Sequence, residues 1–275
     1  MSTSTLPLLI EPDDLEHYLN NPNVRVVDLC RADIYARQHI PGALHLDYTK
    51  IIRNKPPVIG LLPDASTLSA IFSDLGLTPQ TQVVAYDEEG GGKASRLLWT
   101  LQAMGHKQVS LLNGGLAAWA AEGHRVDAAP VAVAPTSYTA NVNNSVVADR
   151  AYILGKLKNP AACLLDCRTA REFSGEVRSA ERAGHIPGAV NMDWLLAMDQ
   201  ARNLRFRTPD ELRALLTQRG VTPDKEVVVY CHTHHRSAHT YMMLKSLGYE
   251  RVRGYAGSWS DWGNAADTPV ETGMG

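Results

Sequence analysis

The chain has 275 residues, of which 44% are hydrophobic and 20% charged, proportions typical of a globular protein with one large or two ordinary domains. A net charge of −2 gives no reason to expect a nucleic-acid partner, and the absence of an apolar run near 18 residues gives none to expect a membrane one. The start of the chain lacks the pattern of a signal peptide. Four irregularly spaced cysteines do not suggest a disulfide framework, which fits a reducing cytoplasm. We expect the protein to be a monomer.

In chain order, the first half alternates helices with short apolar strands. Helices are predicted at residues 11–20, 65–75 and 94–104, and strands at 24–28, 82–86 and 109–111. This alternation predicts an α/β fold in which a mostly parallel sheet has helices on both faces. Ligands of such sheets bind at the carboxyl ends of the strands, which here are the loops after Tyr86 and Tyr230.

The second half repeats the landmarks of the first in the same order. They are an apolar run ending near Asp and Arg (26–31 and 164–168), His-Ile-Pro-Gly-Ala (39–43 and 185–189), a strand ending in Tyr (83–86 and 228–230) and a segment with Gly and Trp (112–119 and 254–262). This repetition predicts two homologous domains that arose by duplication. We assign residues 1–127 to the first domain, 128–145 to an Ala- and Pro-rich linker and 146–275 to the second, whose first helix is expected near Ala148.

A strand, a tight loop and a helix follow one another around Cys231. The apolar residues 227–230 form the strand, Cys231 opens the loop, Arg236 closes it, and a helix from near Ser237 ends at Gly248. Such a loop turns backbone N–H groups inward, and the helix N-terminus adds positive potential. Both effects lower the pKa of a thiol, so Cys231 is predicted to be a nucleophile. We expect this side chain to be open to solvent, and a side chain closed off from solvent would contradict its role as a nucleophile.

These elements together resemble the rhodanese family over nearly the whole chain. The loop Cys231-His-Thr-His-His-Arg236 is similar to that of bacterial thiosulfate:cyanide sulfurtransferases of the Azotobacter type. It departs from the Cys-Arg-Lys-Gly-Val-Thr loop of animal rhodaneses and from the Cys-Gly-Ser-Gly-Val-Thr loop of mercaptopyruvate sulfurtransferases. The resemblance implies two rhodanese-like domains, of which the second is catalytic.

The resemblance also implies the reaction. The Cys231 thiolate takes the outer sulfur of thiosulfate as a persulfide and passes it to cyanide or another thiophilic acceptor, without a cofactor. Loop N–H groups would hold the persulfide, and Arg236 would order the loop and supply charge. In the first half Asp87 stands where Cys231 stands, followed by Glu88 and Glu89. A carboxylate is a poor sulfur nucleophile, so the first domain is expected to be silent.

Other candidates for substrate or anion binding surround the nucleophile. They are the loop residues His232, Thr233, His234 and His235, with Arg178, Arg182 and Trp194 outside the loop. The histidines lie too close together in sequence for a typical zinc site, so no metal is expected. Solvated loop residues and steering of anions, which would strengthen below pH ~6.5, both stay open for them.

Several residues have a structural interpretation. His39 and His185 are expected to be turn residues, Glu172 to pair with an arginine, and Cys30, Cys163 and Cys167 to be core or turn residues. Arg178 and Arg182 are open between exposed surface residues and anion binding. Trp194 is a candidate aromatic wall beside the loop.

Three other functions compete with thiosulfate sulfurtransfer. They are mercaptopyruvate sulfurtransfer, a sulfur carrier that holds a persulfide for a protein partner, and a phosphatase. Phosphatases of the Cys-loop-Arg type place five residues between Cys and Arg, whereas this chain has four. The smaller ring of amides suits one sulfur better than a tetrahedral phosphate.

Overall fold

The structure is a computed structural model that describes residues 6–274. Residues 1–5, which belong to the start of the chain considered for a signal peptide, and residue 275 lie outside the described residues. Within 6–274, every helix is too short or too polar to cross a membrane. The chain divides into two compact units. Unit 1 holds the described residues up to Ile51, Pro63–Asn143 and Asp199–Phe206, and unit 2 holds Ile52–Leu62, Asn144–Met198 and the described residues from Arg207 onward.

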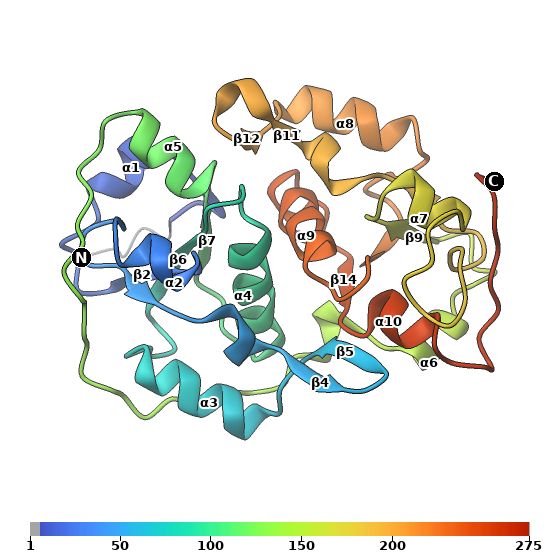
Figure 1. The fold of residues 1–275 in the computed structure, drawn as a ribbon, viewed down its shortest axis with the longest axis horizontal. Coiled ribbons are helices and arrows are strands. Elements are labelled where there is room, and N and C mark those ends of the chain that lie inside the picture. The colour runs from blue at the N-terminus through green and yellow to red at the C-terminus, as the bar shows by residue number, and fades with distance from the viewer. Residues whose placement is uncertain (1–5, 275) are drawn as a thin grey trace. The chain divides into compact units, whose positions relative to one another are not determined.

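Unit 1 contains a five-stranded parallel sheet with helices packed around it (Figure 1). The strand order is β1 (Leu9–Ile10), β7 (Val109–Leu112), β6 (Gln82–Tyr86), β2 (Val24–Asp28) and β3 (Leu44–His45). Its helices are α1 (Pro12–Glu16), α2 (Ala32–Tyr35), α3 (Ala65–Asp74), α4 (Gly92–Ala103) and α5 (Gly115–Ala121), with the 3-10 helix η1 (Tyr48–Ile51).

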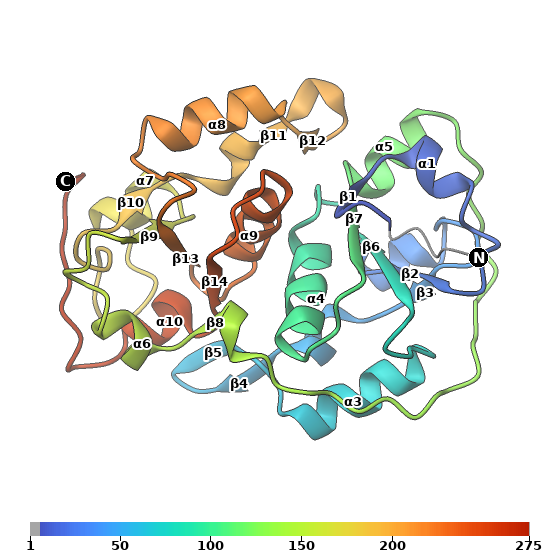
Figure 2. The same ribbon diagram turned by 180° about the vertical axis from the view of Figure 1, so that it is seen from behind.

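Unit 2 repeats this topology, as Figure 2 shows from behind. Its parallel sheet runs β10 (Val190–Asn191), β9 (Ala162–Asp166), β13 (Glu226–Tyr230), β14 (Val252–Tyr255) and β8 (Val147–Ala148). Its helices are α6 (Arg150–Leu154), α7 (Ala170–Ser174), α8 (Pro209–Thr217), α9 (Arg236–Ser246) and α10 (Ser258–Trp262), with 3-10 helices η2 (Asn144–Val146) and η3 (Trp194–Ala197). The predicted α/β class and duplication are confirmed.

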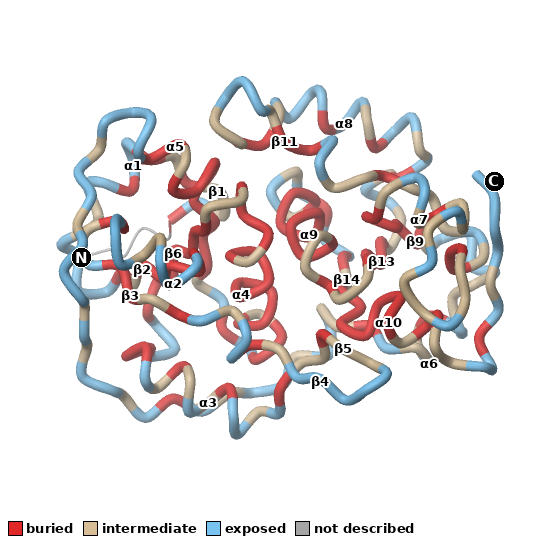
Figure 3. Tube along the Cα trace, in the orientation of Figure 1, coloured by how far each residue is buried: buried red, intermediate tan, exposed pale blue. Residues whose placement is uncertain are grey.

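The central strand of unit 2 is buried because both of its faces are covered. Val227, Val228, Val229 and Tyr230 have no exposed surface. A continuous apolar run of this kind suits a parallel strand between two layers of helices. The helix that follows, α9, is buried over most of its length (Figure 3). This buried strand and helix hold the two ends of the Cys231 loop.

The repeated His-Ile-Pro-Gly-Ala segments have the same contacts in both units. His39 stacks on Tyr35 with ring centroids 4.0 Å apart, and its Nδ1 lies 2.8 Å from the Tyr35 carbonyl oxygen. His185 stacks on Phe173 at 3.6 Å, and its Nδ1 lies 2.8 Å from the Phe173 carbonyl oxygen. Both histidines are buried. Their predicted structural role is therefore confirmed.

Several predicted helix ends differ from the structure, and the largest difference is at α1. Helix α1 ends at Glu16 instead of continuing to residue 20, because the chain turns where the Asn21 side chain accepts a hydrogen bond from the Asn23 N–H. In unit 2, Ala148 belongs to strand β8. Helix α6 starts only after Asp149, whose side chain caps it by accepting from the Tyr152 N–H at 2.7 Å.

Each unit also includes a segment from the other half of the sequence, which the sequence analysis did not predict. An antiparallel hairpin of β4 (Arg53–Lys55) and β5 (Val58–Leu61) belongs to unit 2. Residues 199–206, which include the 3-10 helix η4 (Gln200–Arg202) and strand β12 (Arg205–Phe206), belong to unit 1. β12 pairs with β11 (Met198–Asp199).

Candidate active site

The loop that carries Cys231 connects β13 to α9 in unit 2. Cys231 directly follows the last residue of β13, and α9 begins at Arg236. The loop closes tightly because His234 adopts a left-handed conformation with φ of 57°. Its first residue is fixed on both sides: the Cys231 N–H donates to Ser258 Oγ at 3.2 Å, and the Trp259 N–H donates to the Cys231 carbonyl oxygen at 2.9 Å.

The Cys231 thiol has a pKa below its ordinary value although the residue is buried. Burial is the largest influence and acts to raise the pKa, because a thiolate loses hydration. The positive charge of Arg236, two hydrogen bonds from the Ser237 hydroxyl and N–H, and one from the Thr233 N–H together outweigh it. The loop therefore stabilises a thiolate, as the sequence predicted from its position.

The expectation that the Cys231 side chain is open to solvent was wrong. Cys231 is 1% exposed, whereas its neighbours His232, Thr233, His235 and Arg236 are partly exposed. The sulfur is covered because the loop folds its own N–H donors around that atom. A donor must therefore be small, or the loop must open, before sulfur can be transferred.

The other three cysteines differ from Cys231 in the direction of their pKa. All four are free and buried. Burial raises the pKa of Cys30, Cys163 and Cys167. At Cys163 and Cys167 burial outweighs the positive charges of Lys225 and Arg236, so these thiols stay protonated and inert. Their contacts thus fit the predicted structural role, and Cys231 alone of the four has the electrostatics of a nucleophile.

Arg236 forms a two-point ion pair with Glu172 of α7. Arg236 Nη1 lies 2.7 Å from Glu172 Oε2, and Nη2 lies 2.9 Å from Oε1. Burial tends to raise the pKa of Glu172, but the Arg236 hydrogen bonds and charge, with those from Thr169, lower it to about 2. Glu172 is therefore ionised at neutral pH and orients the guanidinium beside the thiolate. This is the arginine partner that the sequence predicted for Glu172.

Ser237, which the sequence analysis named only as the start of a helix, links His234 to the nucleophile. Its Oγ lies 2.7 Å from His234 Nδ1 and hydrogen bonds to Cys231. Because the serine hydroxyl donates its proton to the thiolate, its oxygen can accept one from the imidazole N–H. The burial of His234 does not fit the exposed, anion-steering role left open from the sequence, and its contact with Ser237 fits a positioning role.

Replacing Ser237 with alanine should shift the acid limb of the kcat/KM profile to higher pH. A hydrogen bond to a charged group contributes about 1.5–3 kcal/mol, equivalent to roughly 1–2 units in the pKa of Cys231. Activity at pH 6 should therefore fall about tenfold or more and recover near pH 9. Ser246→Ala, at the other end of α9, should leave the limb in place. An unshifted limb in Ser237→Ala would show that the hydroxyl does not stabilise the thiolate.

The remaining candidates for the loop surround Arg236 and Ser237. Burial and the charge of Arg236 lower the pKa of His232, which is therefore neutral at pH 7 and contributes little charge to anion steering. The Trp194 ring, half-buried at the start of η3, lies with its centroid 5.6 Å from that of His235 and 5.2 Å from that of His239. The position of Trp194 therefore fits the predicted aromatic wall beside the loop.

Arg178 and Arg182 contact other parts of unit 2. Arg178 pairs with Glu181 at 3.0 Å and donates to the Ala180 carbonyl oxygen. Arg182 donates to the carbonyl oxygens of Trp262, Ala265 and Thr268 and to the Thr268 hydroxyl. These contacts order the irregular segment at 176–182 and tie it to the C-terminal region. The anion-binding role of both arginines stays a prediction that these contacts do not support.

The equivalent loop of unit 1 has a carboxylate where unit 2 has the thiol. Asp87 Oδ1 accepts from the N–H groups of Glu89 at 2.9 Å and Gly91 at 2.8 Å, and Oδ2 accepts from Ala94 at 2.9 Å. Burial and the charge of Glu89 raise the pKa of Asp87 to about 6, against these hydrogen bonds. The cradle of amides is thus preserved in unit 1, but its anion is a fixed side chain without a sulfur nucleophile.

The β4–β5 hairpin contacts the Cys231 loop within unit 2, a contact that no pattern in the sequence predicts. The Ser260 N–H donates to the His232 carbonyl oxygen at 3.0 Å. The Ile59 N–H donates to Ser260 Oγ at 3.1 Å, and that hydroxyl donates to the Ile59 carbonyl oxygen at 2.8 Å. Gly60 has a φ of +79°, and a Cβ there would lie 2.6 Å from the Thr233 Cβ. The hairpin therefore leaves the loop no room on this side.

Gly60→Ala should disturb the loop in a way that a glycine elsewhere does not. The matched control is Gly220→Ala, because Gly220 has a φ of +68° with no atom within 4 Å of an added Cβ. Both should lose about 1–2 kcal/mol of unfolding free energy to the left-handed backbone. Gly60→Ala should lose about 1–3 kcal/mol more from overpacking, and kcat/KM should fall on the order of 10- to 100-fold. Chemical denaturation measures the two stabilities, and steady-state kinetics measure the two activities. Equal activities of the two variants would show that the hairpin does not position the loop.

Comparisons with known proteins agree with this geometry. The rhodanese-like domain family matches residues 11–122 and 150–265. The chain is 45% identical over 268 residues, 98% of each chain, to the thiosulfate sulfurtransferase of Azotobacter vinelandii. It is 33% identical over 280 residues, 97% of each chain, to a sulfur carrier protein of Thermus thermophilus. The crystal structure of the Escherichia coli 3-mercaptopyruvate sulfurtransferase superposes with a TM-score of 0.83 at 28% identity, covering 92% of this chain and 99% of that one. A duplicated fold, a thiolate-stabilising loop in its second half and these matches show that the chain belongs to the rhodanese family.

Proposed function

We propose that this protein is a thiosulfate sulfurtransferase that works through a persulfide on Cys231. The observation that carries the proposal is the geometry of the loop, which places the Cys231 thiol at the start of α9 beside Arg236, whose guanidinium Glu172 orients. This arrangement lowers the pKa of Cys231. The similarity to the Azotobacter vinelandii enzyme over almost the full length of both chains supports thiosulfate as the donor. The equivalent position in unit 1 is Asp87, so one catalytic site per chain is proposed.

In the first step, the Cys231 thiolate attacks the outer sulfur of thiosulfate. A bond forms between Cys231 Sγ and that sulfur while its bond to the inner sulfur breaks, and the electron pair leaves with sulfite. The new persulfide carries one negative charge. The N–H groups of Thr233 and Ser237, which stabilise the thiolate, are placed to stabilise this anion as well. Arg236 remains protonated throughout and compensates the charge of the incoming dianion.

In the second step, a thiophilic acceptor attacks the outer sulfur of the persulfide. Its bond to Cys231 Sγ breaks, the thiolate returns and the acceptor leaves with the sulfur, as thiocyanate when the acceptor is cyanide. Because the donor product leaves before the acceptor reacts, the kinetics should be ping-pong. All residues invoked come from unit 2 of one chain, which supports the proposal that the protein acts as a monomer. The four free cysteines support a reducing, cytoplasmic location.

Intact mass and steady-state kinetics test this function. Thiosulfate should add one sulfur atom to the protein, and cyanide should remove it. Double-reciprocal plots of rate against thiosulfate concentration, at several cyanide concentrations, should be parallel lines. Mercaptopyruvate in place of thiosulfate should support a lower kcat/KM. A higher kcat/KM with mercaptopyruvate would show that mercaptopyruvate is the donor. Hydrolysis of a phosphate ester, with no mass gain of the protein after thiosulfate treatment, would show that the protein is a phosphatase.

A sulfur carrier is a second candidate, favoured by the similarity to the Thermus thermophilus carrier protein. In that case the same Cys231 persulfide would form but would move only to a protein acceptor. The burial of Cys231 fits slow exchange with solvent. Turnover with cyanide and with small thiols separates the two: rapid multiple turnovers support the enzyme, and one slow turnover supports the carrier.

A further inference from the structure

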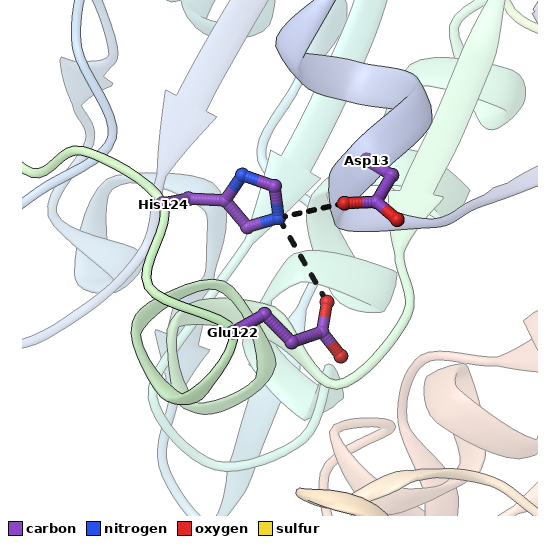
Figure 4. A group of neighbouring side chains, drawn as sticks. All are labelled: Asp13, Glu122 and His124. Carbon is purple, nitrogen blue, oxygen red and sulfur yellow. Dashed lines mark ion pairs between the residues drawn. The ribbon is translucent and has the colours of Figure 1, made fainter.

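A second cluster of polar side chains lies in unit 1, outside the sulfur-transfer site. Asp13 of α1, Glu122 at the end of α5 and His124 just beyond it bring three metal-binding atoms within 4.8 Å of one another (Figure 4). His124 Nε2 lies 3.2 Å from Asp13 Oδ1 and 3.8 Å from a Glu122 carboxylate oxygen. We infer that these three residues bind a divalent transition-metal ion of the zinc type. This departs from the expectation, drawn from the loop histidines, that the chain has no metal site.

The strongest indication is the buried nitrogen of His124. The side chain is 7% exposed, and its Nε2 has no hydrogen-bond partner. A buried nitrogen without a hydrogen bond costs free energy unless another interaction replaces it. Figure 4 shows this nitrogen directed between the Asp13 and Glu122 carboxylates. The lone pair of this nitrogen points at the place where the two carboxylates converge, which is the arrangement that a cation binds.

The distances suit coordination by one ion. Zinc binds histidine nitrogen and carboxylate oxygen at about 2.0–2.2 Å, so tetrahedral ligand atoms lie about 3.3 Å apart. The spacing between His124 Nε2 and Asp13 Oδ1 has this value, and the Glu122 oxygen needs only a small rotation of an exposed side chain. One imidazole with two carboxylates is a donor set for first-row divalent metals, because imidazole selects against magnesium and calcium.

The surroundings also support a bound cation. Glu16 Oε2 lies 3.3 Å from the second ring nitrogen, Nδ1, of His124. A carboxylate that accepts from this nitrogen holds the proton there and leaves Nε2 free to bind metal. The Trp119 ring packs against the imidazole with centroids 4.5 Å apart and fixes its plane. The histidine is thus oriented before any ion arrives.

The charge around the cluster favours a cation despite two arginines. Arg205 pairs with Glu11 at 2.8 Å and with the other oxygen of Glu122. Arg205 and Arg202 also line a surface hollow of about 470 Å³ to which Asp13 and Glu122 contribute. Four carboxylates, from Glu11, Asp13, Glu16 and Glu122, face these two guanidiniums and a histidine that is neutral when it binds metal. The net charge is negative, and a divalent ion would balance it.

Calorimetric titration with zinc chloride tests the site in the full-length, tag-free protein. The Cys231→Ser background removes the thiolate as a competing ligand. One zinc ion per chain should bind with a Kd in the micromolar range or below, and the melting temperature should rise with zinc. Asp13→Asn should weaken binding at least tenfold and His124→Gln should abolish it. The control variants Asp14→Asn, in α1, and His17→Gln, directly after it, change exposed residues outside the cluster and should bind as the parent.

Two outcomes would overturn the assignment. Zinc binding that survives both Asp13→Asn and His124→Gln would place the ion elsewhere, for example at the loop histidines. Absence of binding at about 100 μM, together with destabilisation in His124→Gln, would show that the carboxylates hold the His124 side chain in place without a metal ion. Asp13 is 88% exposed, so Asp13→Asn keeps the test decisive even if His124→Gln does not fold.

Discussion

Replacing Cys231 with serine will reduce sulfur transfer from thiosulfate to the level of the uncatalysed reaction. The substitution keeps the loop's hydrogen bonds but removes the sulfur atom on which we propose that the persulfide forms. A serine hydroxyl in the same cradle is not ionised at neutral pH and cannot hold a transferable sulfur. Thiocyanate formation measures the loss of sulfur transfer, and intact mass after thiosulfate treatment measures the loss of the persulfide. Both losses should be complete.

The other cysteines provide the control. Cys163→Ser and Cys167→Ser concern thiols whose pKa is raised by burial, so neither should prevent the mass gain in protein that remains folded. Persulfide on Cys231→Ser protein, located by peptide mapping at Cys167 or in unit 1, would assign the chemistry to another thiol. The same result would refute the silence of unit 1, where Asp87 occupies the equivalent position.

Replacing Arg236 with methionine should raise the pKa of Cys231 and lower stability at the same time. Arg236 is the largest of the influences that lower this pKa, so its loss moves the acid limb of kcat/KM to higher pH. Each unit of pKa reduces the thiolate population at neutral pH about tenfold, and we expect a loss of roughly 10- to 100-fold at pH 7. Kinetics from pH 5 to 9 measure this effect.

The stability effect has a different cause, because Arg236→Met leaves the Glu172 carboxylate without its partner. The Glu172 and Arg236 side chains are 13% and 20% exposed. Breaking the pair should therefore cost about 2–3 kcal/mol, below the range for a fully buried pair. In the parent, Glu172 has a pKa of about 2 against an ordinary 4.5. Its contribution is present above pH 4.5 and is lost as the pH falls from 4.5 towards 2.

A double variant separates the two effects. Glu172→Gln with Arg236→Met removes both charges, so the unfolding free energy at pH 7 should return most of the way to that of the parent. The acid limb should stay shifted, because the positive charge beside Cys231 is still missing. Recovery of activity along with stability would show that Arg236 only holds the loop together and does not tune the thiol.

The fold could be predicted well because its signals are local. Strands β2 and β6 were predicted with the bounds that the structure shows, since each is a short apolar run between turn residues. Helix α3 differs from its prediction by one residue at its end. Helix α1 was overextended because its apolar spacing continues into a segment where asparagine side chains compete for backbone hydrogen bonds. The spacing of apolar residues carries no information about this competition for hydrogen bonds.

The parts of the site that consist of neighbours in the sequence could be predicted. The parts that depend on contacts between distant segments could not. Cys231 and Arg236 share one loop, so their relation could be inferred from spacing. Ser237 and His234 lie in the same stretch, but their hydrogen bond depends on the left-handed turn at His234. Gly60 is distant in sequence and reaches the loop only through the tertiary fold, so no pattern around Cys231 could have indicated it.

The hairpin at 53–61 has a consequence for how this protein can be divided. A gene fragment that encodes only residues 146–275 would contain Cys231, Arg236 and Glu172 but not the β4–β5 segment that packs on Ser260 and Thr233. In the same way, a fragment ending at residue 127 would lack Arg205 and Phe206, which bond to Glu11 and Asn113. Each fragment therefore lacks a segment that its unit contains, and we expect neither to fold as stably as the full chain. If the first half is silent as proposed, this exchange of segments gives a physical reason for its retention after duplication.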